Sequence, residues 1–319
     1  MKEIHCQELN DDITLIDIEL KQPGIGASYL IQEGDKAALV ETGTGHSTAI
    51  LLEALRQRKV PLEAVEYVIL THIHLDHAGG AGSLMRHLPN ARLVVHPRGA
   101  RHMIDPSKLI AGAMAVYGEE KLRELFGEIL STPKDRIIEA KEGLSLSLGK
   151  RNLAFWDTPG HALHHCCIVD ETSRGIFTGD TFGISYRLFD TEKGPFVSPS
   201  ASPVQFDPQA AHASIDRIAK HGARYVYLTH YGRLERPESL AQGLHEYLDE
   251  LVEIANRAEG ESDRTSFLAK RLETFMIDRM RANGCTLEYE KIMEFWKVDL
   301  ELNARSEEHT SELQSRQSI

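Results

Sequence analysis

A dense group of histidine and aspartate side chains sets the tightest limit on the fold of this chain. The segment Thr71-His-Ile-His-Leu-Asp-His77 places three histidines and one aspartate within six positions. It follows the apolar run Tyr67-Val-Ile-Leu70, which is typical of a buried strand, and precedes Ala78-Gly-Gly80, where we expect a helix to begin. Any fold must therefore place these polar side chains where a buried strand leaves its sheet.

Metal binding explains this cluster better than a polar surface does. In an extended chain His72 and His74 point to the same side, because side chains alternate with a period of two, so both can reach one ion. Asp76 and His77 lie past the bend and can turn toward a second ion. Neutral imidazoles and a carboxylate suit Zn²⁺ and other borderline divalent ions. The segment thus predicts a metal site.

Three later segments share one arrangement, in which an apolar strand ends in a turn of small residues that presents a possible ligand. They are Phe155-Trp-Asp-Thr-Pro-Gly-His161, Ile176-Phe-Thr-Gly-Asp180 and Val226-Tyr-Leu-Thr-His230. In α/β folds, sites are usually built at the sheet edge beyond the strand ends. Four such ends that carry His or Asp therefore indicate one shared pocket.

Apolar periodicity predicts one α/β catalytic domain over residues 1–235. We expect antiparallel strands first, at residues 13–18, 28–32 and 37–41, and an alternation of strand and helix after them. Further strands are expected at 65–70, 92–95, 143–148, 152–156, 166–169, 175–178 and 225–228, and helices at 47–58, 81–88 and 208–221.

Four segments depart from this alternation. Residues 100–135 are expected to hold a helical insertion long enough to form a lid, and the proline-rich segment 183–208 a long functional loop. Residues 236–303 show helical periodicity without strands, which predicts an extension that covers the pocket or forms a homodimer. Residues 304–319 contain the in-frame translation of a widely used sequencing-library adapter, so we expect a non-native tail.

Composition narrows the partners and the compartment. The chain has 48 acidic and 36 basic residues, a formal charge of −12 and no dense basic cluster, which disfavours nucleic-acid binding. No apolar run approaches the roughly 18 to 20 residues that span a bilayer, so no membrane partner is expected. The start of the chain lacks the pattern of a secretory signal, which favours a cytoplasmic location.

Taken together, these motifs resemble the metallo-β-lactamase superfamily over about residues 10–235, through its His-x-His-x-Asp-His signature and its later His, Asp and His positions in order. The chain is most similar to the glyoxalase-II-like hydrolases, through Thr71 to Gly80, Val95-His-Pro97, Asp157-Thr-Pro-Gly-His161 and Phe177-Thr-Gly-Asp180. The resemblance implies an α/β fold, a four-layer αββα sandwich, here with a C-terminal helical appendage.

The resemblance also implies a ligand set for two divalent metal ions, most often zinc, with iron or manganese as alternatives. His72, His74 and His161 would bind one ion, Asp76, His77 and His230 the other, and Asp180 would bridge the two. Asp76 and Asp180 are then the catalytic carboxylates, because Asp76 can also orient the attacking water or relay a proton.

Other positions near the pocket are secondary candidates. Glu41 stands where the family usually has aspartate before Thr-Gly, and we expect it to steer a ligand histidine. Of His164 and His165, one is expected to face the core or orient a ligand. Candidate substrate contacts, for which packing is an equally good explanation, are Met114, Tyr117, Phe182, Tyr186, Arg187 and Tyr231.

The resulting hypothesis is a dinuclear metallohydrolase whose metal-bridging hydroxide cleaves ester-type bonds in small molecules. Carboxylic esters, thioesters, lactones and phosphoesters all remain open, and promiscuity is expected, because the loops rather than the ligands select the substrate. The main alternative is a di-iron protein that uses or senses oxygen. A nuclease that processes nucleic acid is a third hypothesis, which the acidic charge disfavours.

Overall fold

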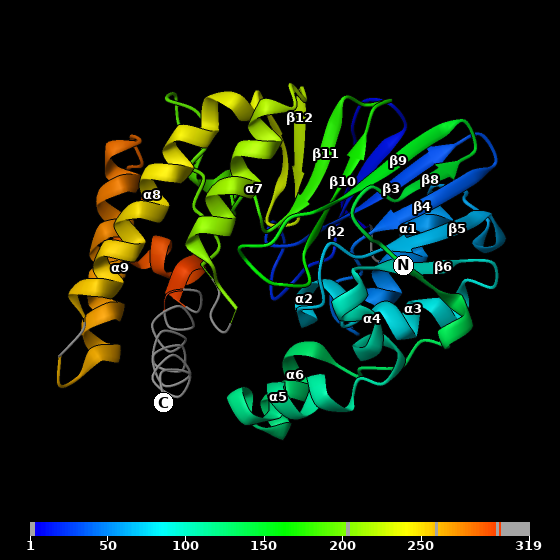
Figure 1. Cartoon of the computed structure of the whole chain (residues 1–319), viewed down its shortest axis with the longest axis horizontal. Helices are drawn as coiled ribbons and strands as arrows, with labels where there is room; N and C mark the ends of the chain where they lie inside the picture. The colour runs from blue at the N-terminus through cyan, green and yellow to red at the C-terminus, as the bar shows by residue number, and fades with distance from the viewer. Residues whose placement is uncertain (1–3, 202–204, 259–260, 298–299, 301–319) are drawn as a thin grey trace.

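Two β-sheets lie face to face in the computed structural model, and helices cover the outer face of each sheet (Figure 1). The structure describes residues 4–201, 205–258, 261–297 and 300. The expected four-layer αββα sandwich and the helices at its C-terminal side are therefore confirmed. The predicted tail at 304–319 lies outside the described residues.

The first sheet has seven strands in chain order. Its strands are β1 (Cys6–Glu8), β2 (Ile13–Asp17), β3 (Ala27–Glu33), β4 (Lys36–Val40), β5 (Val65–Ile69), β6 (Arg92–Val95) and β7 (Ile137–Glu139). From β1 to β4 the neighbours are antiparallel, as the sequence predicts, and from β4 to β7 they are parallel. The parallel half requires a crossover between strands, and helices provide it.

The second sheet has six strands in the order β13-β12-β11-β10-β9-β8. These are β8 (Ser145–Leu148), β9 (Arg151–Asp157), β10 (Cys166–Asp170), β11 (Gly175–Gly179), β12 (Tyr225–Leu228) and β13 (Gly232–Glu235). All neighbours are antiparallel except β11 and β12. All residues of β10, β11 and β12 are buried, because the facing sheet covers one side of these strands and helices cover the other.

Helices complete the outer layers and the insertion. They are α1 (Ser47–Gln57), α2 (Leu75–Ala78), α3 (Ala81–His87), α4 (Pro97–Ile104), α5 (Ser107–Tyr117), α6 (Glu119–Phe126), α7 (Pro208–Lys220), α8 (Pro237–Arg257) and α9 (Arg264–Ala282). Short 3₁₀ turns occur at Leu62–Ala64, Lys134–Arg136 and Arg187–Phe189, and residues 289–297 are also helical. No described helix is both long enough and apolar enough to cross a bilayer.

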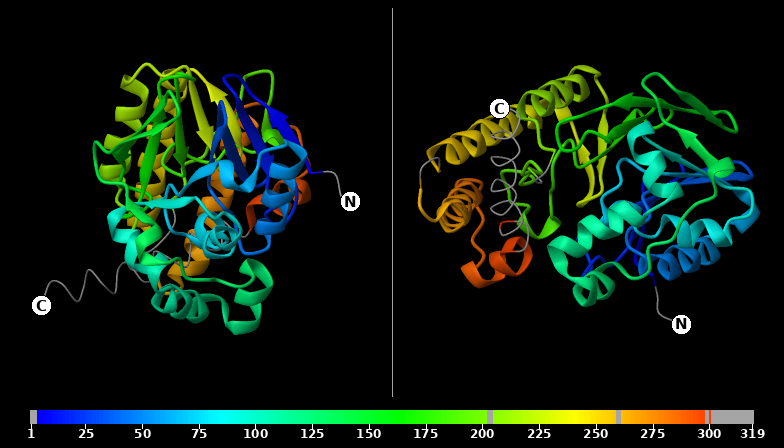
Figure 2. Two further views of the ribbon diagram at one scale, coloured as in Figure 1. Left: turned by 90° about the vertical axis from the view of Figure 1, so that its right-hand side faces the viewer. Right: turned by 60° about the horizontal axis from the view of Figure 1, so that its bottom comes forward.

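Two groups of helices lie away from the first sheet. The pair α5 and α6, which meets at Gly118, lies below the sandwich in Figure 1 and at the bottom of the left-hand view of Figure 2. Helices α7 and α8 cover the second sheet, where Ile215 and Leu244 join Val226 in one apolar cluster. The Asp207 side chain accepts a hydrogen bond from the Ala210 N–H and so caps α7.

Five of the named strands and α-helices were not predicted from the sequence, namely β1, α2, α4, β7 and β13. Three of them are strands of three or four residues, too short to show a period of their own, and neighbouring strands hold them in place. Helix α4 begins at Pro97, with His96 as its cap, since the His96 ring accepts a hydrogen bond from the Arg98 N–H. His96 is thus a structural histidine.

Candidate metal centre

The seven predicted ligands meet at one edge of the sandwich, each at the end of an element. His72 and His74 follow β5, Asp76 and His77 belong to α2, and the other three follow β9, β11 and β12, namely His161, Asp180 and His230. Their ligand atoms form three overlapping groups, each within 4.8 Å: His72 with His74 and His161, His72 with His77 and Asp180, and Asp76 with His77 and His230.

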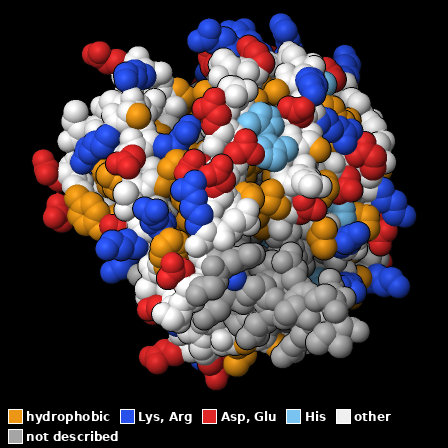
Figure 3. Space-filling view, turned by 60° about the vertical axis from the view of Figure 1, so that its left-hand side comes forward, with side chains coloured by type: hydrophobic (Ala, Val, Ile, Leu, Met, Phe, Trp, Pro, Cys, Tyr) orange, Lys and Arg blue, Asp and Glu red, His pale blue; other side chains and the backbone are white. Residues whose placement is uncertain are grey.

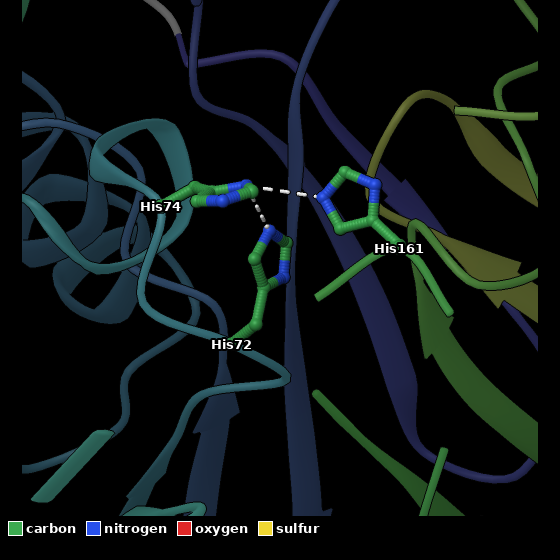
Figure 4. A group of neighbouring side chains, drawn as sticks. All are labelled: His72, His74 and His161. Atoms are coloured by element: carbon green, nitrogen blue, oxygen red, sulfur yellow. Dashed lines mark hydrogen bonds between the residues drawn. The ribbon is translucent and has the colours of Figure 1, made fainter. Parts of the chain in front are cut away.

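The first group is a set of three imidazoles that point at one another (Figure 4). His74 Nδ1 lies 2.9 Å from His72 Nε2 and 3.0 Å from His161 Nε2. On the far side of its ring, His161 Nδ1 lies 3.0 Å from the Ser200 carbonyl oxygen and must carry the proton there. His161 Nε2 therefore directs a lone pair toward the other two rings, as a metal ligand does.

The second group has a similar construction. His230 Nδ1 donates to the Ile25 carbonyl oxygen at 2.9 Å, which leaves a lone pair on His230 Nε2. That nitrogen lies 3.3 Å from His77 Nε2 and 3.4 Å from Asp76 Oδ2. Two ring nitrogens and one carboxylate oxygen thus converge on a second point.

Asp180 lies between the two groups. Its Oδ1 is 3.3 Å from His77 Nε2 and 3.7 Å from His230 Nε2, whereas its Oδ2 is 3.6 Å from His161 Nε2. Ser200 donates a hydrogen bond to Oδ2 at 3.2 Å. Each carboxylate oxygen therefore faces a different ligand group, which is the geometry that a bridging carboxylate needs.

Burial and charge set the protonation of this cluster. Burial holds the pKa of His72 and of His74 well below the usual value, so both rings are neutral. Burial also opposes ionisation of Asp180, but His77, His230 and His161 outweigh it and keep the Asp180 pKa well below its usual range. His72 and His74 are thus neutral imidazoles beside an ionised carboxylate, which are ligand forms that divalent metals require. Burial also lowers the pKa of His77 and of His230, but Asp180 and Asp76 outweigh it and raise the pKa of both rings.

Three buried polar atoms at the site lack hydrogen-bond partners within the described part of the chain, which fits a bound pair of metal ions. Asp180 Oδ1, His77 Nδ1 and Glu41 Oε2 are buried, and none of the three has a hydrogen-bond partner among the described residues. A buried polar atom without a partner costs about 1–3 kcal/mol, and more for a charged group. A cation between the two ligand groups would satisfy Asp180 Oδ1, so the residues fit the ions that the resemblance implies.

Glu41 supports the cluster from behind, where the sequence predicts a steering residue. It is fully buried, its Oε1 accepts the Thr71 N–H at 3.1 Å, and its Oε2 faces His77 Nδ1 at 3.4 Å. The backbone of Glu41 adopts φ +70°, an unusual conformation for a residue with a side chain. The site thus accommodates the longer side chain of glutamate, which links Thr71, directly before the first ligand, to the ring of His77.

His165 supports the cluster from the other side and faces the core, as expected for one of the two neighbouring histidines. Its Nε2 accepts the Asp180 N–H at 3.3 Å, and its Nδ1 lies 2.9 Å from Thr158 Oγ1. The ring therefore fixes the backbone that presents Asp180. The sequence could not distinguish it from His164, because adjacent side chains exchange roles if the strand shifts by one residue.

The structure places the candidate substrate contacts in different surroundings. Phe182 is fully buried in the apolar cluster below α7 and α8, and the Tyr186 ring centroid lies 5.1 Å from that of Trp296, so both are packing residues here. Tyr231 donates to Asp17 Oδ2 at 3.4 Å. The Arg187 guanidinium contacts the Ser185 carbonyl oxygen, Tyr117 packs against Phe126, and Met114 is exposed on α5.

A small cavity opens beside His161 and Asp180 and contains residues that the sequence did not single out. Its walls come from the segment before α7 and from α7 and α8, through Ser200, Phe206, Ala211, Ile215 and Leu248. Apolar wall residues at helical spacing resemble any other core residues, so the sequence held no signal for their position beside the ligands.

Fold and site together define a metallohydrolase-type sandwich, and the family comparison agrees. The model of the metallo-β-lactamase superfamily matches residues 22–230. The chain therefore belongs to the metallo-β-lactamase superfamily, whose members are generally hydrolases.

Among curated relatives, the metallo-β-lactamase fold-containing protein ST1585 of Sulfurisphaera tokodaii is 26% identical over 230 residues, covering 71% of this chain and 80% of that protein. Its crystal structure superimposes with a TM-score of 0.64 at 19% identity, over 94% of this chain and all of that one. The thioesterase pkgB of Emericella nidulans is 28% identical over 153 residues, which are 48% of this chain but only 34% of that protein.

Proposed function

We propose that this chain is a dinuclear metallohydrolase that cleaves ester-type bonds in small molecules. The position of Asp180 carries the proposal, because its two carboxylate oxygens face two separate groups of possible metal ligands. Two bound divalent cations would supply Lewis acidity and would lower the pKa of water from about 16 toward roughly 7. His72, His74 and His161 would hold one ion, and Asp76, His77 and His230 the other.

Asp76 is the residue best placed to handle a proton. Its side chain is 33% exposed, whereas those of His77 and His230 are 0% and 6% exposed, so Asp76 lies on the open side of the site. The neighbouring His77 and His230 outweigh burial and hold the Asp76 pKa below its usual range, so the carboxylate is ionised at neutral pH. It can therefore accept a hydrogen bond from water and orient it toward a substrate carbonyl.

Thioesters are the bond class that we place first. The name of the similar protein pkgB gives this class, and carboxylic esters share the same carbonyl chemistry. Lactones and phosphoesters come next, because nucleophilic water attacks carbonyl carbon and phosphorus alike. The walls beside the ligands, rather than the ligands, would select among these bonds.

Metal content and turnover of purified protein test the proposal together. We expect two divalent ions per chain and hydrolysis of at least one member of a panel made of an acyl thioester, an aryl ester, a lactone and a phosphodiester. Redox-active iron without turnover of any panel member would contradict the hydrolase and would favour the oxygen-using alternative.

Variants of one ligand and one exposed histidine link the activity to the site. His74→Ala should lower kcat/KM by more than about 100-fold and lower the metal content, since loss of even a hydrogen-bond partner behind a ligand costs 10–100-fold. His87→Ala, an exposed position on α3, is the matched control and should leave both unchanged. Equal activity of the two variants would exclude the ligand assignment.

A further inference from the structure

A second group of histidines and aspartates lies outside the candidate metal centre, between α7 and α8. His212 on α7 and His245 on α8 face each other with Nδ1 atoms 2.6 Å apart and rings inclined by 18°. On the outer side of each ring lies a carboxylate: Asp249 Oδ1 is 3.1 Å from His212 Nε2, and Asp216 Oδ1 is 3.0 Å from His245 Nε2. The four side chains form a continuous row.

The row crosses from one helix to the other twice. Each helix supplies a histidine and, four residues later, an aspartate on the same face. Neither aspartate pairs with the histidine of its own helix, because Asp216 of α7 binds His245 of α8 and Asp249 of α8 binds His212 of α7. This symmetric exchange fixes both rings in orientation with their inner nitrogens aimed at one point.

The two Nδ1 atoms, of His212 and His245, need a cation between them. A carboxylate only accepts hydrogen bonds, so each Nε2 that faces one must carry its ring proton. A neutral imidazole has a single N–H, and both Nδ1 atoms are then left with lone pairs directed at each other across 2.6 Å. Two lone pairs at this distance repel unless a proton or a metal ion lies between them.

The arrangement matches the hydrogen-bonding pattern of metal-binding histidines. Such a ring almost always donates its second N–H to a carboxylate, a carbonyl or water, and here a carboxylate lies behind both rings. Zinc–nitrogen distances of about 2.0–2.1 Å place two tetrahedral ligands roughly 3.3 Å apart. For both lone pairs to converge on one tetrahedral ion, the rings would have to tilt as well as move apart by less than about 1 Å.

Access from solvent is open. The side chains of His212 and His245 are 30% and 19% exposed, so water can reach the inner nitrogens and complete the coordination of an ion. Figure 3, which brings forward the side of the molecule that holds α8 and α9, shows exposed histidine side chains with acidic side chains around them. Negative charge at this surface attracts divalent cations.

We propose that His212 and His245 bind one divalent transition-metal ion between α7 and α8, with Asp216 and Asp249 as the acceptors behind the rings and water as the remaining ligands. The ion would clamp two helices whose Ala211, Ile215 and Leu248 form a wall of the cavity beside His161 and Asp180. It is separate from the proposed catalytic pair and would stabilise that wall rather than take part in hydrolysis.

Calorimetric titration with Zn²⁺ of protein purified without added metal tests the clamp. Wild type should bind one equivalent more than His212→Ala and than His245→Ala, and Asp249→Asn should weaken that equivalent by about 10–100-fold, as loss of the acceptor behind a ligand does. The exposed-histidine control His87→Ala should bind like wild type. The difference in bound equivalents between wild type and variant does not depend on how many ions the candidate metal centre binds. Circular dichroism checks that each variant is folded.

Thermal unfolding gives a second readout that does not depend on activity. Added Zn²⁺ should raise the Tm of wild type and of His87→Ala further than that of His212→Ala, because an ion that binds only the folded chain stabilises it. If His212→Ala and His245→Ala bind as many equivalents as wild type, or if Zn²⁺ shifts all Tm values equally, the rings share a proton and the clamp is excluded.

Discussion

At the scale of single residues, Glu41 joins two parts of the metal centre that are distant in the sequence. One oxygen accepts the N–H of Thr71, directly before the first ligand, and the other faces His77 Nδ1. A carboxylate at that position keeps the His77 proton on Nδ1, so that Nε2 is free to face the ligand group. Glu41 thus selects the tautomer of a ligand rather than binding an ion itself.

The variant Glu41→Gln should therefore weaken metal binding by about 10–100-fold. If the amide group of glutamine turns toward His77, it presents an N–H where the carboxylate presented an oxygen, and the ring proton moves to Nε2. Competition with a chelator of known affinity measures the effect. Glu290→Gln, an exposed position with the same chemical change, is the control, and an equal affinity of both variants would rule out this role for Glu41.

Arg151 also carries a fully enclosed charge. Its side chain is 1% exposed, its guanidinium contacts Asp170 at 2.9 and 2.6 Å through two nitrogens, and a third contact reaches the Asp11 carbonyl oxygen at 2.8 Å. Asp11 precedes β2 of the first sheet, whereas Arg151 and Asp170 belong to β9 and β10 of the second. The pair therefore ties the two sheets together.

Removal of one partner should be costly. We expect Arg151→Met to lower the free energy of unfolding by about 3–5 kcal/mol, because Asp170 is left as a buried charge without its partner. Denaturant titration measures this loss. In the exposed pair of Arg257 with Glu253, Arg257→Met should change little, since solvent screens that contact. Similar losses for the two variants would argue against the enclosed pair as a link between the sheets.

At the scale of elements, the turn after β9 is built around close contact with α7. Gly160 has φ +134°, and a Cβ there would lie 2.4 Å from the Ala211 Cα. The Gly160 carbonyl oxygen also accepts the Asp207 N–H at 2.8 Å, at the start of α7. His161 follows immediately, so the position of α7 and that of a ligand are set by the same turn.

Gly160→Ala should accordingly destabilise the fold and lower the metal content together. Gly143→Ala is the matched control, because Gly143 also has a positive φ, +76°, but no atom within 4 Å of a Cβ. The control should show only the backbone cost of about 1–2 kcal/mol and retain its metal. Denaturant titration with elemental analysis separates the two effects, and matching results at both positions would mean that contact with α7 is unimportant.

At the scale of the whole molecule, the proposed metal pair joins segments from both sheets. The ligands follow β5 of the first sheet and β9, β11 and β12 of the second, so ions bound there link the two halves of the sandwich. One ring nitrogen of His77 and one oxygen each of Asp180 and Glu41 are buried without a hydrogen-bond partner among the described residues. The stability of the entire fold should therefore depend on metal.

Chelation should lower the Tm, and added Zn²⁺ should restore it. A site at a free metal concentration of 100 Kd contributes about 2.7 kcal/mol of stability, which corresponds to a shift of roughly 4 °C in Tm for a chain of this length. Scanning calorimetry with and without chelator measures the change. The shift in Tm should be smaller in His74→Ala than in His87→Ala. If chelator leaves the Tm of every variant unchanged, the stability of the fold does not depend on metal.

The C-terminal helices are packed into the molecule more closely than periodicity alone could reveal. Leu244 and Leu248 of α8 belong to the apolar cluster of the second sheet. Trp296 contacts Tyr186 and Phe196 of the proline-rich loop, with ring centroids 5.1 and 6.3 Å apart. Their amphipathic pattern predicted a partner surface, and for these faces that surface is the chain's own loop and second sheet.

The family, the main strands and the possible ligands could be predicted from the sequence, because they depend on local periodicity and on motifs whose residue types and spacing a metal explains. Three features became visible only in the folded chain: which ring nitrogens point inward, that His165 rather than His164 supports Asp180, and that the His212 and His245 rings meet between α7 and α8. These features arise from contacts between segments far apart in the chain, and such contacts cannot be predicted from local sequence patterns.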